Sequence, residues 1–229
     1  MQAVILAGGY GTRMKPLTDF IPKPLLPLGE KTIIEHLIDH CIKNGFSKIL
    51  LTLNYKADLI IEYLKEKNYK FNYIIENKPL GTAGCLKNAE KMLEKTFLVL
   101  SGDNYTKQNL RELLSFHKKK KAVMSLALIK PKNPREYAIV KLNKNNQVLM
   151  FKEKPKGRLF SRLTTCGTYI INKNLLKFIP KSKKFDISYD FIPLLLKNNI
   201  EIYGKLMKGF WEDIGNFERY ENVARLLSL

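Results

Sequence analysis

The sequence has few cysteines and lacks the patterns in which cysteines usually serve a fold. Its three cysteines are Cys41, Cys85 and Cys166, and no two of them form a CxxC pair. An odd number without such a pair favours neither a disulfide framework nor a cysteine zinc site. We therefore expect all three to be small buried side chains.

Long apolar segments are also absent. The longest apolar stretches, residues 49–53 and 191–196, are far shorter than the roughly 20 residues that cross a membrane. Residues 1–6 lack the basic leader and the long apolar region of a secretory signal. We expect a cytoplasmic protein with no membrane-spanning helix.

Acidic residues are scarce compared with basic ones. The chain has 21 Asp and Glu against 40 Lys and Arg, a formal net charge of +19. Basic surfaces attract polyanions, but the lysines are spread along the chain and only Lys118 to Lys121 forms a run. We interpret that run as the solvated end of a helix. Without a recognisable motif we expect no specific nucleic acid and no membrane as partner.

The order of apolar and amphipathic stretches indicates the fold class. Short apolar runs alternate with helical periodicity in the first half, which predicts parallel strands joined by helices in a doubly wound α/β arrangement. The expected strands there are residues 3–6, 47–53, 72–75 and 96–100, and the expected helices are 32–43, 59–65 and 84–93. Strand-like segments dominate later, at 122–129, 137–141, 148–151 and 165–171, before helices at 189–197 and 216–227. The prediction is one domain with a mixed, mainly parallel sheet.

A glycine-rich loop, Gly8-Gly9-Tyr10-Gly11-Thr12-Arg13, follows the first expected strand. Glycines after a strand let backbone N–H groups approach an anion, and Arg13 adds a bidentate phosphate donor. The spacing is not the GxxxxGK[ST] of a P-loop. Nor is it the GxGxxG of a dinucleotide site, because Met14 occupies the third glycine position counted from Gly9. Taken alone, the loop is either a phosphate cradle or a turn without a ligand.

Five motifs occur along the chain in a fixed order. The glycine loop continues through residues 14–18 and into Ile21-Pro22-Lys23-Pro24-Leu25-Leu26-Pro27. The other four are Leu80 to Gly84, Asp103, Glu153 to Pro155, and Trp211 to Gly215. Together these motifs span nearly the whole chain. In these motifs the chain resembles the sugar-1-phosphate nucleotidyltransferases, in particular a short, single-domain form of the mannose- and heptose-1-phosphate guanylyltransferases.

This resemblance implies a Rossmann-like nucleotidyltransferase fold without a C-terminal β-helix. It implies a nucleotide-binding half over residues 1–110 and a sugar-phosphate-binding half over residues 111–229. The implied reaction transfers a nucleoside monophosphate from an NTP to a sugar 1-phosphate and releases pyrophosphate, with Mg²⁺ as cofactor. A homodimer is left open.

The resemblance also implies roles for individual residues. Arg13 would hold the leaving pyrophosphate, Lys23 the transferring phosphate and Lys154 the sugar phosphate, while Asp103 and Asp213 would hold the metal. The implied nucleotide-binding set is Leu6, Ala7, Gly8, Gly9, Gly11, Thr12, Arg13, Lys23, Glu76, Gly81, Thr82 and Asp103, and the implied sugar-phosphate-binding set is Glu153, Lys154, Thr165 and Gly167.

One position bears on the choice of base. Glu76 lies five residues before Gly81, where uridylyl-transferring relatives commonly carry Gln. A carboxylate only accepts hydrogen bonds, so it suits the N1–H and N2–H donors of guanine, unless Glu76 points outward. GTP with a mannose- or heptose-type sugar is the expectation, although Thr165 stands where mannose enzymes commonly have Asn, and Ala138 where they have Gly.

Other functions remain as alternatives. They are uridylyl or thymidylyl transfer to a hexose 1-phosphate, cytidylyl transfer to a non-sugar phosphate, and a nucleotide-binding regulator without catalysis. His36 and His40, four residues apart in the expected helix 32–43, do not form the HExxH arrangement of a metal pair. We interpret both histidines as structural.

Overall fold

The computed structural model describes residues 1–227, which form two compact units with interleaved sequence. The first unit contains Met1–Pro79, Leu100–Gln108 and the segment from Gly209 onward, and the second contains Leu80–Val99 and Asn109–Lys208. The units thus do not follow the expected division at residue 110. The chain changes unit inside strand β6 (Thr96–Ser101). Which ligand belongs to which half stays a prediction.

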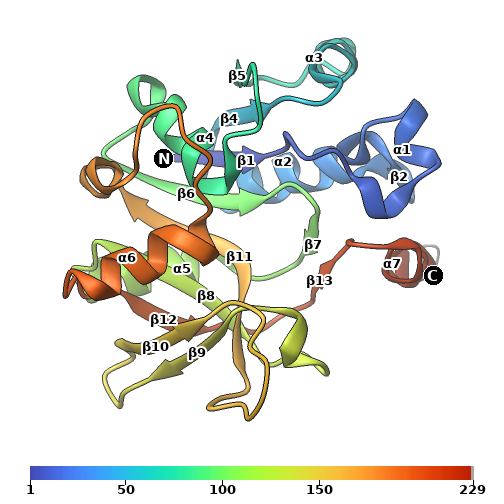
Figure 1. Ribbon diagram of the computed structural model, residues 1–229. Coiled ribbons are helices and arrows are strands. Elements are labelled where there is room, and N and C mark those ends of the chain that lie inside the picture. Colours follow the sequence, from blue (N-terminus) through green and yellow to red (C-terminus); the bar gives the residue numbers. More distant parts are fainter. Residues whose placement is uncertain (228–229) are drawn as a thin grey trace. The chain divides into compact units, whose positions relative to one another are not determined.

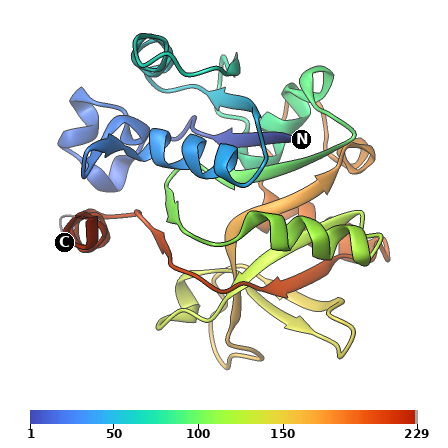
Figure 2. The same ribbon diagram turned by 180° about the vertical axis from the view of Figure 1, so that it is seen from behind.

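The first unit is built on three parallel strands in the order β1 (Gln2–Leu6), β4 (Lys48–Leu53) and β5 (Asn72–Ile75). Most residues of β1 and β4 are buried, as is typical of parallel strands covered on both faces. Helix α2 (Ile33–Lys43) lies between β1 and β4 in the chain, and α3 (Ala57–Glu66) lies between β4 and β5. Figures 1 and 2 show α2 running along one face of β1.

Helix α2 has strong local start and stop signals. The Thr32 backbone N–H donates to Glu35 Oε2 at 2.7 Å and the Glu35 N–H donates to Thr32 Oγ1, which together form a capping box. Burial opposes ionisation of Glu35, yet hydrogen bonds from Thr32 and from the Tyr63 hydroxyl hold its pKa below the ordinary value. The helix ends at Lys43, as predicted, and is followed by Asn44 and by Gly45 in a left-handed conformation.

Two segments far apart in the sequence pair within the first unit. Strand β7 (Asn104–Thr106) runs antiparallel to β13 (Trp211–Asp213), with Asn104 opposite Asp213. This pair continues as the Ile214 N–H donates to the Asp103 carbonyl at 2.9 Å. After β13 the chain forms α7 (Phe217–Leu227), whose Tyr220 hydroxyl donates to a main-chain carbonyl of β2 (Pro27–Leu28). Strand β2 pairs with β3 (Lys31–Thr32), directly before α2.

The second unit has a mainly antiparallel arrangement of strands. Strand β9 (Ile139–Leu142) pairs with β10 (Val148–Lys152) and with β11 (Leu163–Asn172). Strand β8 (Met124–Ile129) pairs with β11 and, in parallel, with β12 (Tyr203–Leu206). Helices α5 (Leu110–Lys119) and α6 (Ile192–Lys197) lie on opposite faces of these strands, as comparison of Figure 1 with Figure 2 shows. Strand β8 is buried along its whole length, whereas β10 carries exposed side chains such as Leu149 and Met150.

Short helical segments complete the chain. They are α1 (Leu17–Phe20), α4 (Gly81–Asn88), a π-helical turn at Ile187–Phe191 and five 3₁₀ segments at Thr12–Met14, Lys23–Leu25, Glu90–Met92, Pro134–Glu136 and Lys173–Phe178. The expected helix 84–93 begins earlier, at Gly81, and gives way to a 3₁₀ segment. The expected helix 189–197 begins only at Ile192, because the π-helical turn precedes it. Strands β2, β3, β7, β12 and β13 were not predicted.

The expectation for the cysteines is met, because Cys41, Cys85 and Cys166 are buried and none of them is in a disulfide. Across residues 1–227, no helix combines the length and the apolar character that crossing a membrane would require.

Candidate active site

The glycine-rich loop connects β1 to the first 3₁₀ segment of the first unit. The Ala7 N–H donates to the Thr52 carbonyl at 2.9 Å, which ties the start of the loop to the end of β4. Gly11 has φ 64°, and a Cβ at this position would lie 2.9 Å from Thr18 Cγ2 and 3.1 Å from Lys23 Cβ. Only glycine suits such a position. Gly9, Thr12 and Arg13 are exposed residues, so this part of the loop lies at the surface.

Lys23 is a buried cation held by an acid from a distant strand. Its residue is 7% exposed, and its Nζ donates to Asp103 Oδ2 at 2.9 Å. Lysine is rarely buried without such a counter-ion. Lys23 begins a 3₁₀ segment twelve residues after Gly11, while Asp103 follows β6, so the ion pair joins two of the sequence motifs.

The second predicted acid, Asp213, lies close to the first. The antiparallel pairing of β7 with β13 explains this, because Asp103 directly precedes Asn104 and Asn104 lies opposite Asp213. Burial and the negative charge of Asp103 raise the pKa of Asp213, while Lys23, Arg219 and Arg13 oppose that rise. Two carboxylates and three cations therefore share one electrostatic environment.

Gly215 lets Arg13 approach this acid pair. A Cβ on Gly215 would lie 2.9 Å from Arg13 Nη1, 3.1 Å from Arg13 Nη2 and 3.0 Å from Asp213 Oδ1. The Arg13 guanidinium thus lies against the main chain just after Asp213. The N-terminal motif and the Trp211–Gly215 motif consequently form a single site within the first unit.

The donor set at Asp103 and Asp213 suits a hard divalent cation. Carboxylate oxygens are the protein ligands that Mg²⁺ prefers. Burial and then the charge of Asp103 raise the pKa of Asp213, and a bound cation would offset that charge. Among residues 1–227 there is no cluster of three or more His, Cys, Asp or Glu able to hold a metal. Mg²⁺ commonly uses one or two carboxylates and completes its shell with water and substrate phosphates. The acid pair fits that mode of binding.

Glu76 is fixed at the end of β5 in the first unit. Its N–H donates to the Leu53 carbonyl at 2.8 Å, and its own carbonyl accepts from Asn54 Nδ2 at 2.6 Å. The residue is 7% exposed, so it is buried and does not project into solvent. Its contact with a base stays a prediction.

Gly81 and Thr82 belong to the second unit, where they begin α4. A Cβ on Gly81 would lie 2.8 Å from the Phe185 carbonyl. The Thr82 N–H donates to Asp186 Oδ1 at 3.2 Å, and Thr82 Oγ1 accepts from the Ile187 N–H at 2.8 Å. The polar groups of Thr82 are thus engaged within the unit, and its predicted nucleotide contact is untested.

Glu153 and Lys154 lie in the second unit, just after β10. Burial raises the pKa of Glu153, and Asp186 raises it further, whereas Lys154 and a hydrogen bond with Ser188 lower it. Lys154 has φ 38°, a conformation that non-glycine residues seldom adopt and that tends to occur at functional sites. Its N–H donates to the Tyr137 carbonyl at 3.2 Å.

Thr165 and Gly167 lie on β11, where the register with β8 shifts between Thr165 and Tyr169. Gly167 has φ 72° inside this irregularity. Burial raises the pKa of Tyr169 to about 12, and its hydroxyl also forms hydrogen bonds with Ser188 and Thr165. The predicted Glu153 and Thr165 are therefore joined through Ser188 and Tyr169, which sequence reasoning missed.

His36 and His40 are engaged with main-chain carbonyls of the first unit. His36 Nε2 lies 2.7 Å from the Leu28 oxygen, and His40 Nε2 lies 2.8 Å from the Gln108 oxygen. These contacts tie α2 to neighbouring segments, which agrees with a structural role for both residues.

The fold and the first-unit site define an α/β protein that combines a glycine loop, a buried lysine and an acid pair suited to a divalent cation. The sequence profile of the family described as Nucleotidyl transferase matches residues 2–228. The chain belongs to this family.

Relatives support the same assignment. The chain is 35% identical over 224 residues to the mannose-1-phosphate guanyltransferase of Saccharomyces cerevisiae, covering 94% of this chain and 61% of the relative. It is 33% identical over 221 residues to the bifunctional protein GlmU of Methanococcus maripaludis, covering 94% of this chain and 52% of that protein. The chain thus spans between about half and three fifths of the length of these curated relatives.

A solved structure confirms the fold class. The crystal structure of HddC from Yersinia pseudotuberculosis, complexed with GMP-PN, superposes with a TM-score of 0.83 at 31% sequence identity. The match covers 98% of this chain and 98% of HddC. The predicted α/β fold with a mixed sheet is therefore correct.

The raised pKa of Glu153 generates a pH-dependent prediction. Its ordinary value is 4.5, and the higher value in the folded state means that the ionised carboxylate destabilises the fold once the pH exceeds the ordinary pKa. We expect Glu153→Gln to raise the melting temperature at pH 7.5, and the gain to vanish at pH values below about 4. Thermal melts followed by circular dichroism across this range would measure it.

The matched control is Glu62→Gln, an exposed position on α3. It should give no comparable gain at neutral pH. A Glu153→Gln variant that is less stable than the wild type at pH 7.5, or whose gain persists in acid, would contradict the electrostatic interpretation.

Proposed function

We propose that this chain is a Mg²⁺-dependent nucleotidyltransferase that joins a nucleoside monophosphate from an NTP to a sugar 1-phosphate. The observation that carries the proposal is the group formed by Asp103, Asp213, Lys23 and Arg13 beside the glycine loop. Such a group can neutralise several phosphate charges at once. Sugar phosphate as the acceptor is supported by the relatives, among them a mannose-1-phosphate guanyltransferase.

In the proposed reaction a phosphate oxygen of the sugar 1-phosphate attacks the α-phosphorus of the NTP. A new bond forms between that oxygen and the α-phosphorus, and the bond from the α-phosphorus to the bridging oxygen of the β-phosphate breaks. The products are an NDP-sugar and pyrophosphate. Catalysis of this kind depends on positioning and on charge stabilisation.

The residues of the first unit divide this work. Backbone N–H groups of the glycine loop and the Arg13 guanidinium would hold the leaving pyrophosphate, and Lys23 the transferring phosphate. Asp103 and Asp213 would hold Mg²⁺, which when bound neutralises charge on the reacting phosphates. The Lys23–Asp103 ion pair keeps both side chains oriented before substrates arrive.

The second unit would supply the contacts to the sugar phosphate. Lys154 would neutralise its phosphate, and the left-handed backbone at this residue fixes where the side chain departs from the chain. Glu153, oriented by Ser188, would accept hydrogen bonds from sugar hydroxyls. Thr165 and Gly167 line the irregular part of β11 and would contact the same sugar.

Guanine is the proposed base. The support is the buried Glu76 carboxyl group, which can only accept hydrogen bonds when ionised, and the GMP-PN in the HddC structure. A mannose- or heptose-type sugar is the proposed acceptor. The proposed location is the cytoplasm, where NTPs are made, without a specific nucleic-acid or membrane partner.

Pyrophosphate release tests the reaction directly. The purified protein is incubated with Mg²⁺, each of the four NTPs, and a panel of sugar 1-phosphates and non-sugar phosphates such as phosphocholine. We expect release for at least one pairing, and none after chelation of the metal. Asp103→Asn should lower the turnover roughly 100-fold or more, as loss of a charge-stabilising group does, whereas Asp58→Asn, at an exposed position of α3, should not.

Failure of a folded protein to release pyrophosphate with every pairing would contradict the proposal. Nucleotide binding without any turnover would favour a regulator instead. Near-normal turnover of Asp103→Asn would remove Asp103 from the metal site.

The base preference has its own test. Glu76→Gln replaces an acceptor carboxylate with an amide, so we expect the ratio of kcat/KM for GTP to that for UTP to fall roughly 10-fold or more. Steady-state rates with both nucleotides measure this ratio. Glu66→Gln, on exposed α3, is the charge-matched control. An unchanged ratio would show that Glu76 does not select the base.

A further inference from the structure

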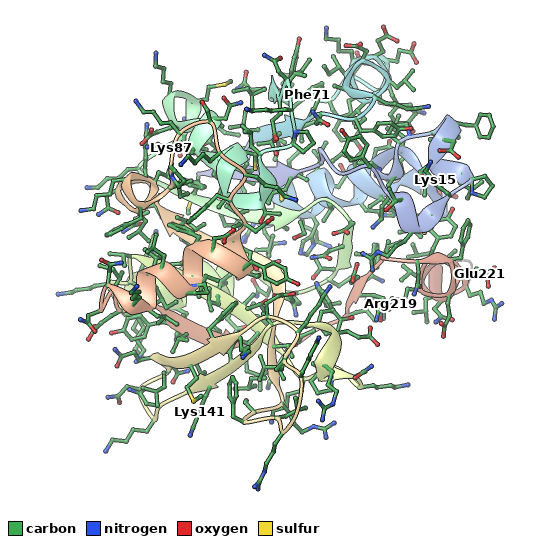
Figure 3. The ribbon with its side chains drawn as sticks, viewed as in Figure 1. Lys15, Phe71, Lys87, Lys141, Arg219 and Glu221 are labelled. Atoms are coloured by element: carbon green, nitrogen blue, oxygen red, sulfur yellow. The ribbon has the colours of Figure 1, made fainter. Side chains whose placement is uncertain are left out.

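Helix α7 carries a cationic side chain, Arg219, that binds one member of the acid pair. Arg219 Nη1 donates to Asp213 Oδ2 at 3.0 Å, and Arg219 Nε lies 3.7 Å from Glu212 Oε1. Figure 3 labels Arg219 on α7, the helix that follows β13. The guanidinium therefore bridges two consecutive acids at the end of β13.

This ion pair differs from an ordinary surface pair on the same helix. The side chains of Arg219 and Asp213 are both 19% exposed. In contrast, Arg225 and Glu221, also on α7, are 78% and 60% exposed with their atoms 3.4 Å apart. Exposed pairs of the latter kind contribute little to stability or order. The Arg219 pair is shielded and can hold a side chain in place.

The start of α7 is itself fixed. The Arg219 backbone N–H donates to Asn216 Oδ1 at 3.0 Å, and the Tyr220 N–H donates to the Asn216 carbonyl at 3.0 Å. Asn216 thereby caps the first turn, from which the Arg219 side chain departs. A planar guanidinium on a capped turn constrains the direction from which it meets a carboxylate.

In each acid of the pair, one carboxylate oxygen accepts a hydrogen bond from a cationic side chain. Asp103 uses Oδ2 for Lys23, and Asp213 uses Oδ2 for Arg219. The other oxygen of Asp213, Oδ1, is the atom beside Gly215. The cation on Oδ2 thus sets the rotation of the carboxylate and so the direction of Oδ1. Lys23 and Arg13 have proposed phosphate roles, whereas the Arg219 guanidinium binds Asp213 and lies near Glu212.

We propose that Arg219 is a positioning residue that orients the Asp213 carboxylate for the divalent cation, and that α7 is thereby part of the metal-binding apparatus. The inference rests on the proposed function, in which Asp103 and Asp213 hold the metal. Removing a side chain that holds a metal ligand in its orientation commonly lowers the metal affinity 10- to 100-fold. Removing the positive charge of Arg219 would strengthen attraction for the cation, and we expect the loss of orientation to outweigh that effect.

The test measures binding of Mn²⁺ alone to the whole protein. Free Mn²⁺ is followed by electron paramagnetic resonance, and quenching of Trp211, the single tryptophan and part of β13, reports binding near the acid pair. Arg219→Gln removes both the positive charge and the planar guanidinium group with its several N–H donors. Arg219→Lys keeps the charge without that group, and Arg225→Gln is the matched control on the same helix. Asp213→Asn removes the proposed ligand.

We expect Arg219→Gln to weaken Mn²⁺ binding about 10-fold or more. Arg219→Lys should also bind more weakly than the wild type, and Arg225→Gln should match the wild type. The Mg²⁺ concentration for half-maximal turnover should rise in Arg219→Gln, while KM for the sugar phosphate stays close to that of the wild type. If Arg219→Gln fails to fold, the Arg219→Lys result decides.

Two outcomes would overturn the inference, and they are distinguishable. If Asp213→Asn weakens Mn²⁺ binding but both Arg219 variants bind as tightly as the wild type or more tightly, the metal assignment stands and the role of Arg219 is wrong. If the wild type and Asp213→Asn give the same Mn²⁺ titration, the metal assignment fails and the role of Arg219 fails with it.

Discussion

The close placement of two partly buried carboxylates, Asp103 and Asp213, is the constraint on which the candidate site of the first unit depends. Removing charges from water is costly unless each has a partner, and the raised pKa of Asp213 reflects that cost. Three cations oppose it, and each comes from a different segment. Arg13 is the last residue of the glycine loop, Lys23 begins the 3₁₀ segment Lys23–Leu25, and Arg219 lies on α7. Residues from both ends of the chain thus meet at the acid pair, where β7 pairs with β13.

The same arrangement prepares the site for polyphosphate chemistry. Arg13 and Lys23 stand beside a glycine loop, whose backbone N–H groups favour an anionic ligand. A divalent cation at the acid pair would strengthen that preference and relieve the repulsion. The second unit contributes a separate acid and cation, Glu153 and Lys154, with Ser188 orienting the acid. Each unit therefore combines carboxylates with cations.

Local patterns in the sequence predicted the local structure well. The parallel strands β1, β4 and β5 and the capped helix α2 follow from apolar periodicity and from turn residues, which act over a few positions. Strands β7 and β13 are three residues long, too short for an alternating pattern, and exist because they pair across a hundred residues. The roles inferred for Asp103 and Asp213 came from family motifs. Ser188 and Arg219 gave no signal, because only the fold brings them to Glu153 and Asp213.

The central claim is that Asp103 and Asp213 together form a divalent-cation site. Anomalous diffraction from crystals soaked in Mn²⁺ tests it most directly, because the peak locates the metal independently of catalysis. The account predicts one Mn²⁺ coordinated by a carboxylate oxygen from each of these two residues, with water completing the shell. A peak coordinated by other residues, or well-diffracting soaked crystals with no peak at the acid pair, would contradict it.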